Sequence, residues 1–260
     1  MQSFLFIYLN YSILLKAIKH TPNFITVLNL SSGAISVTFA AGGEFYIAGI
    51  LILIAALFDF LDGFFARILK SYSPIGGQLD SLADMISFGF APAFLLHIYM
   101  KKLMITDYLT TDLVLFEPIV LIVLLSPLLL TAFAALRLAI FNIDERQSEN
   151  FIGLPVPAMA LFFVSAIISM EKQMINLNIH EIIWVTLVVF FSVLMVLSFP
   201  MFSLKFKNYR WKENKIQFIF VGISIILLVT LQTIGISLAV IMYIFLSGLI
   251  NVLRLNRELK

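Results

Sequence analysis

Four aspartates and one arginine lie close together in an otherwise apolar stretch of this chain, which is 61% hydrophobic overall. They are Asp59, Asp62, Arg67, Asp80 and Asp84. A carboxylate inside an apolar segment is costly unless it faces a partner charge, a polar cavity or a metal, so such residues indicate a functional site. Members of the first aspartate pair are three residues apart and members of the second are four apart, which places each pair on one face of a helix.

A break between the two pairs would let them meet. The segment from Ser71 to Gly77 contains one proline and two glycines, which disfavour a continuous helix. We therefore expect a helical hairpin that brings the four carboxylates together. They would repel one another unless divalent cations lie among them, and Mg²⁺ or Mn²⁺ prefers such oxygen ligands. The alternative is that the aspartates only pair with basic residues inside the membrane.

The composition excludes several classes of protein. A mean hydropathy of +1.04 with 12% charged residues indicates a polytopic membrane protein. The net charge of +2 arises from scattered basic residues and gives no reason to expect nucleic-acid binding. The absence of cysteine excludes disulfides, thiolate nucleophiles and cysteine-ligated zinc. We expect a single domain over residues 1–260.

Eight apolar segments are long enough to cross a bilayer. If the N-terminus is cytoplasmic, only Lys101, Lys102 and Lys172 of the 17 lysines and arginines lie outside, which leaves fourteen inside. This is the positive-inside pattern. We therefore expect an all-α bundle of about eight transmembrane helices in the cell membrane (the inner membrane in a bacterium), with both termini and the aspartate hairpin cytoplasmic. The segments lie near 24–42, 46–66, 81–99, 116–136, 154–170, 182–200, 216–233 and 235–253.

Residues 1–15 are apolar and aromatic, and Lys16 and Lys19 follow them. A secretory signal has its positive charges first, so this order argues against one. We expect an interfacial helix over residues 1–20, with Tyr8 and Tyr11 at the membrane surface. The alternative is that these residues do not belong to the natural N-terminus.

The span near 24–42 carries two kinds of polar residue. Small residues from Ser31 to Ser36 favour close helix packing, within the chain or in a homodimer. Asn23, Thr26 and Asn29 recur at three-residue spacing near the cytoplasmic end and form one polar stripe at the level of the hairpin.

The aspartate stretch reads D-x2-D-G-x2-A-R-x8-G-x3-D-x3-D from Asp59 to Asp84. It resembles the signature of the CDP-alcohol phosphotransferase family at every fixed position. Two further segments, D-S-L-A-D-M-I-S-F-G-F-A-P over 80–92 and R-L-A-I-F-N followed by F-I-G-L-P-V-P-A over 137–158, are similar to the phosphatidylserine synthase branch of that family. One position departs from the branch, because Ile140 stands where a second arginine is usual.

This resemblance implies transfer of a phosphatidyl group from CDP-diacylglycerol to L-serine, giving phosphatidylserine and CMP. It implies two divalent cations, one held by Asp59, Asp62 and Asp80 and the other by Asp59, Asp80 and Asp84. Asp84 would also be the general base. The resemblance further implies a catalytic core over 21–160, additional transmembrane helices over 161–260, and a homodimer in the membrane lipid. The implied contacts to the nucleotide of the CDP-lipid are Asn23, Thr26, Gly63, Arg67 and Ser73.

The acceptor half of the site leaves alternatives open. Arg137 and Asn142 are candidates for acceptor binding, because a guanidinium binds a carboxylate or phosphate through two parallel hydrogen bonds. Arg137 can equally be an anchor at the membrane surface. An acceptor such as glycerol 3-phosphate or inositol phosphate would need additional cationic residues. A membrane transporter also places carboxylates in a membrane core, but it would be expected to carry polar residues to both faces.

Overall fold

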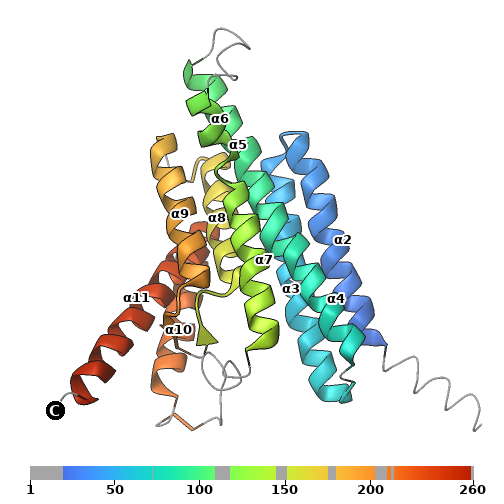
Figure 1. Cartoon of the computed structure of the whole chain (residues 1–260), viewed down its shortest axis with the longest axis vertical. Helices are drawn as coiled ribbons and strands as arrows, with labels where there is room; N and C mark the ends of the chain where they lie inside the picture. Colours follow the sequence, from blue (N-terminus) through green and yellow to red (C-terminus); the bar gives the residue numbers. More distant parts are fainter. Residues whose placement is uncertain are drawn as a thin grey trace, which may run out of the picture.

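The computed structural model describes residues 20–71, 73–108, 118–144, 151–174, 180–202, 210–211 and 214–258. These residues form a bundle of apolar helices with one pair of very short strands (Figure 1). The expected interfacial helix over 1–20 falls almost entirely outside the described residues. The elements are α2 (Thr21–Ala41), α3 (Phe45–Leu69), α4 (Pro74–Asp84), the π-helix η1 (Met85–Phe90), α5 (Ala91–Tyr108), α6 (Pro118–Leu125), α7 (Leu128–Ile143), β1 (Phe151–Ile152), α8 (Val156–Glu171), α9 (Glu181–Val196), β2 (Pro200–Met201), α10 (Lys215–Leu231) and α11 (Thr233–Glu258).

The helices confirm an all-α membrane protein but not the count of eight spans. By length and composition, four stretches of the described chain can cross a membrane: Thr21–Ala41, Phe45–Leu69, Pro74–Met104 and Thr233–Leu253. Helices α6 and α7 meet at a bend of 41° and together make a fifth candidate. Helices α8, α9 and α10 have 16, 16 and 17 residues. At about 1.5 Å per residue each is shorter than a hydrocarbon core of about 30 Å.

The break between the two aspartate pairs is shorter than we expected. Helix α3 ends where Lys70 adopts a left-handed conformation (φ 47°), and α4 begins at Pro74. The Ser73 hydroxyl accepts a hydrogen bond from the Gly76 N–H at 3.0 Å and so caps α4. Proline is favoured in the first helical turn because its missing N–H has no partner there in any case. The predicted break and the hairpin are therefore confirmed, but the break ends at Ser73, and Pro74 and the glycines after it form the first turn of α4.

The end of α7 also differs from the prediction. The span expected to end near residue 136 continues to Ile143, and the chain bends by 41° between α6 and α7, next to Pro127. Arg137 and Asn142 therefore both lie on α7, whereas we expected Asn142 in a loop. The predicted boundary between the last two spans is confirmed, since α10 and α11 separate at Gln232, which has a φ of 55°.

Helix α2 is held against its neighbours by small polar residues. Ser32 Oγ donates to the Leu51 carbonyl oxygen of α3 at 2.7 Å, and Ser36 Oγ donates to that of Ala48 at 2.9 Å. On η1, the Ser87 hydroxyl donates to the Asn29 carbonyl oxygen at 3.0 Å. The buried small residues of α2 thus pack within the chain, and in the structure they are not free to form an interface with a second copy.

The C-terminal helices are tied to the rest of the bundle by polar side chains. Between α8 and α11, Ser165 and Ser237 join their hydroxyls at 2.6 Å. Strands β1 and β2 pair antiparallel beside α11, whose side chains bind the backbone around β2. Tyr243 Oη donates to the Phe202 carbonyl oxygen at 3.1 Å, and Ser247 Oγ accepts from the Phe202 N–H at 3.3 Å. Asn251 Nδ2 donates to the Pro200 carbonyl oxygen at 2.6 Å. We call these three side chains, which are spaced at four-residue intervals, the α11 clasp.

Several ends of the helices gather at one end of the bundle. The start of α2, the end of α3, the start of α4 and the end of α7 all lie at the bottom of Figure 1, as does the C-terminal end of α11. The aspartate hairpin therefore lies toward the same end as both ends of the described chain.

The contact between α2 and η1 predicts that Gly33 tolerates no side chain. A Cβ added to Gly33 would lie 2.7 Å from Ser87 Cα, which is backbone and cannot turn away. We expect Gly33→Ala to destabilise the protein by about 1–3 kcal/mol, as overpacking does, and to lower its Tm in detergent. Gly222→Ala on α10 is the control, because a Cβ there meets nothing within 4 Å. Equal Tm values for the two variants would contradict the tight contact.

Candidate active site

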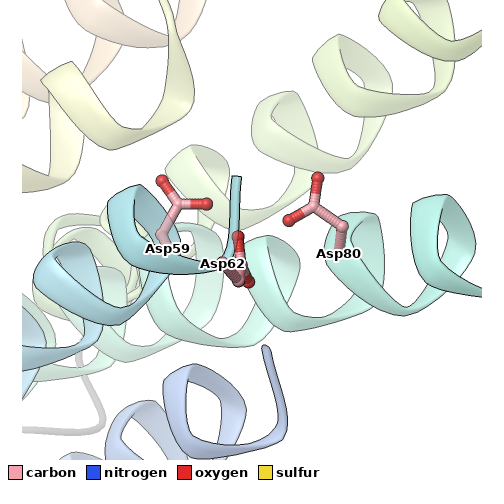
Figure 2. A group of neighbouring side chains, drawn as sticks. All are labelled: Asp59, Asp62 and Asp80. Carbon is pink, nitrogen blue, oxygen red and sulfur yellow. The ribbon is translucent and has the colours of Figure 1, made fainter. Parts of the chain in front are cut away.

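The α3–α4 hairpin places all four aspartates on facing surfaces of two helices. Asp59 and Asp62 lie on the last turns of α3, and Asp80 and Asp84 lie on α4. Because only a few residues join the helices, the two pairs lie at the same level of the bundle. Figure 2 shows the carboxyl groups of Asp59 and Asp80 turned toward each other, with Asp62 between them.

Three of the carboxylates form a compact cluster. Among the described residues, Asp59, Asp62 and Asp80 each offer an oxygen, and these oxygens all lie within 4.8 Å of one another. Asp62 is only 5% exposed, and its Oδ2 has no hydrogen-bond partner. Two unit charges at this separation repel by about 3 kcal/mol or more at an effective dielectric constant near 20. The ion pairs found among the described residues do not involve these aspartates.

Asp84 lies beside this cluster and not within it. Its carboxyl group is next to that of Asp59, and its Oδ1 is buried without a hydrogen-bond partner. The side chain of Asn29 lies against the other side of Asp84, although the two groups do not reach hydrogen-bond geometry. Buried carboxylate oxygens without protein partners are the ligand type that Mg²⁺ and Mn²⁺ select. The donor set therefore fits a divalent cation.

A pocket of about 220 Å³ opens next to the cluster. Asp62 and Asp80 belong to both, so the pocket and the carboxylates share a wall. The structure brings together in this pocket all five residues expected to contact a nucleotide: Asn23, Thr26, Gly63, Arg67 and Ser73.

Gly76 is a pocket residue to which the sequence analysis gave no role, although it is a fixed position of the motif. A Cβ there would lie 3.0 Å from both Asn23 Oδ1 and Ser73 Oγ. A larger residue would therefore push these two polar side chains away from the first turn of α4. Its fixed place in the signature was the available signal, and the spatial reason for it comes from the fold.

The two acceptor candidates lie outside this pocket, on α7. Asn142 Nδ2 donates to Ser81 Oγ at 2.9 Å, so Asn142 reaches the residue next to Asp80. Arg137 is 4% exposed, its guanidinium lies 5.1 Å from the Phe141 ring centroid, and its Nε has no hydrogen-bond partner. Ile140, where the branch has a second arginine, is 38% exposed. Of these two positions, the structure therefore buries the one at which this chain retains arginine, Arg137.

Comparison with known proteins agrees with this geometry. The model of the CDP-alcohol phosphatidyltransferase family matches residues 19–191. The chain is 28% identical over 219 residues to the CDP-diacylglycerol–serine O-phosphatidyltransferase of Helicobacter pylori, covering 83% of this chain and 84% of that one. It is 37% identical over 142 residues to the archaetidylserine synthase of Methanothermobacter thermautotrophicus, covering 54% of each chain. A serine O-phosphatidyltransferase of Methanocaldococcus jannaschii is 31% identical over 154 residues, which is 59% of this chain and 63% of that one.

The cluster predicts metal-dependent stability. Adding Mn²⁺ to metal-free protein should raise the Tm, because an ion that binds only the folded state stabilises it by mass action. In Asp80→Asn the increase should be much smaller, while the metal-free Tm should stay equal or rise because one repulsive charge is gone. Glu171→Gln is the control, since Glu171 pairs with Lys102 at 2.9 Å and lies outside the cluster. A wild-type Tm unaffected by Mn²⁺ would argue against the site.

Proposed function

Because the chain belongs to the CDP-alcohol phosphatidyltransferase family, we propose that it transfers the phosphatidyl group of CDP-diacylglycerol to the hydroxyl of L-serine. The products are phosphatidylserine and CMP. The observation that carries this proposal is the cluster of Asp59, Asp62 and Asp80 sharing a wall with a pocket lined by the family's nucleotide contacts. The choice of serine is supported by the relatives, which are named for serine transfer or archaetidylserine synthesis.

Two divalent cations, Mg²⁺ or Mn²⁺, fit the carboxylates. Asp59, Asp62 and Asp80 would hold one, and Asp59, Asp80 and Asp84 the other. Such ions neutralise a pyrophosphate and favour in-line displacement at phosphorus. The buried oxygens of Asp62 and Asp84 that lack protein partners support this assignment.

The CDP moiety is assigned to the pocket. Arg67 supplies a guanidinium for phosphate, which it can bind through two hydrogen bonds. Gly63 has no side chain, so the α3 backbone itself forms this part of the pocket wall. Among the described residues, a Cβ there would meet only Arg67 Nη1, at 3.6 Å. Asn23, Thr26 and Ser73 supply polar groups at the pocket wall.

Asp84 is assigned as the general base. It accepts the proton of the serine hydroxyl while that oxygen bonds to the phosphorus attached to diacylglycerol, and the bond from this phosphorus to the CMP oxygen breaks. The position of Asp84, next to Asp59 and outside the lining of the nucleotide pocket, supports this role.

Arg137 and Asn142 are assigned to the acceptor side. A carboxylate such as that of serine would pair with Arg137, whose Nε lacks a hydrogen-bond partner in the structure. A phosphorylated acceptor would require further cations near Arg137, which lies with one aromatic ring against its guanidinium. The transporter alternative receives no support from the relatives, which are named as transferases and a synthase.

The remaining architecture is proposed from the charge pattern and the family. We assign one membrane domain over residues 1–260, with the catalytic core at 21–160 and additional helices at 161–260. The chain would cross the cell membrane about eight times, with the active site and both termini cytoplasmic. A homodimer is supported by family resemblance alone.

Activity tests the proposed reaction directly. Purified protein with CDP-diacylglycerol and Mn²⁺ or Mg²⁺ should release CMP when serine is added, and EDTA should abolish the release. Asp84→Asn should lower kcat by about 10²–10⁴, the usual contribution of a general base, while Glu171→Gln should keep full activity. Stimulation by glycerol 3-phosphate or inositol phosphate instead of serine would overturn the acceptor and retain the reaction class.

The two arginines should affect different substrates. Arg137→Lys loses the planar fork that pairs with a carboxylate, so it should raise the KM for serine about tenfold and leave the KM for CDP-diacylglycerol unchanged. Arg67→Lys should raise the KM for CDP-diacylglycerol and leave the KM for serine unchanged. Steady-state kinetics with each substrate varied in turn measures both constants, and a reversed result would show that the assignments of pocket and acceptor side are exchanged.

A further inference from the structure

Asn29 on α2 is a fully buried side chain that finds no hydrogen-bond partner among the residues that the structure describes. Its exposed fraction is 0%, and neither its Nδ2 nor its Oδ1 has a hydrogen-bond partner. Buried amides are nearly always hydrogen-bonded, because leaving one unpaired costs its lost hydration. An unpaired amide inside an apolar bundle therefore calls for a functional explanation.

The side chain next to Asn29, that of Asp84, indicates what the function of Asn29 is. Its side chain lies against the carboxyl group of Asp84, whose Oδ1 is also buried and also unpaired. An amide N–H and a carboxylate oxygen are complementary donor and acceptor. Among the described residues, both groups are buried and unpaired in the same place.

Backbone contacts around Asn29 hold its side chain close to that of Asp84. The Asn29 carbonyl oxygen accepts the Ser87 hydroxyl at 3.0 Å, and one turn later Gly33 packs closely against Ser87. Ser87 lies on η1, which begins immediately after Asp84. Short π-helical segments inside α-helices occur often at functional sites. The same contact thus fixes α2 relative to the helix that carries Asp84.

Asn29 also differs from the two polar residues that precede it at three-residue spacing. Asn23 and Thr26 line the pocket, whereas Asn29 does not. It therefore lies beyond the assigned nucleotide contacts, at the level of the assigned base.

We propose that Asn29 is a positioning residue for Asp84: its side-chain N–H donates to one carboxylate oxygen and directs the other toward the acceptor hydroxyl. This role rests on the proposed function, because it needs Asp84 to act as the base. Asn29 touches neither substrate, so its effect is on the orientation of Asp84 and on kcat.

Two substitutions separate positioning from packing. Asn29→Leu keeps the branched shape and removes both polar atoms, and Asn29→Asp keeps the shape and an acceptor but removes the N–H. Both should lower kcat for serine-dependent CMP release by about 10- to 100-fold, the range seen when a residue that orients a ligand is lost. The KM for CDP-diacylglycerol should stay within about twofold of the wild-type value, because the pocket is untouched.

Stability supplies the second readout. The Tm of metal-free Asn29→Leu should equal or exceed that of the wild type, because an unpaired buried amide is replaced by an apolar group. Ser36→Ala is the matched control on the same helix. It removes a buried side chain that does have a partner, the Ala48 carbonyl oxygen at 2.9 Å, so it should lower the Tm and leave kcat unchanged.

The outcomes distinguish this inference from the proposed function. Wild-type protein that releases no CMP with serine would overturn the proposed function and the role of Asn29 with it. Active wild-type protein with unchanged kcat in Asn29→Leu would overturn only the role of Asn29. A Tm of Asn29→Leu well below that of the wild type would make Asn29 a packing residue, whatever its activity.

Discussion

Mutual repulsion among carboxylates that are partly or fully removed from water is the constraint on which the rest of this structure depends. Asp59, Asp62 and Asp80 must be held together before any cation can compensate them, so other contacts must supply the force. Apolar packing of the surrounding helices contributes to this, and so do neutral hydrogen bonds around the hairpin. Serines of α2 bind carbonyl oxygens of α3, Thr131 of α7 binds the Gly89 carbonyl oxygen of η1 at 3.2 Å, and Asn142 of α7 binds Ser81 of α4. The helices around the site act as a frame that keeps like charges close.

The aspartate motif allowed the carboxylate cluster of the site to be predicted from sequence. Aspartates in an apolar segment have few roles, and their helical spacing limits which can share a face. The residues of the pocket were predicted from the family resemblance, and the polar stripe of Asn23 and Thr26 at the level of the hairpin agreed with it. These inferences need only local geometry, and the structure brings the predicted residues together.

What the sequence analysis missed depends on the balance between local preference and tertiary context. Pro74 is a helix breaker in the middle of a helix and a favoured residue at its start, and only the Ser73 cap decides between the two. The π-helix after Asp84 has no sequence pattern of its own. Asn29 belonged to the predicted polar stripe, but its spacing could not show that its partner would be Asp84. The count of membrane spans stayed undecided because α8, α9 and α10 are each too short for length alone to settle it.

The α11 clasp has a consequence for how this chain responds to substitution. Tyr243 and Asn251 donate to backbone oxygens, and Ser247 accepts from a backbone N–H. The identity of the side chains around β2 is therefore irrelevant to these three bonds. A substitution in that segment therefore leaves these three bonds in place, although it can still disturb the packing of Met201, which is 3% exposed, and of Phe202 against Tyr243. Helix α11 is thus attached in two ways: the bond between Ser165 and Ser237 depends on a side chain at each end, whereas the clasp depends on a side chain at one end only.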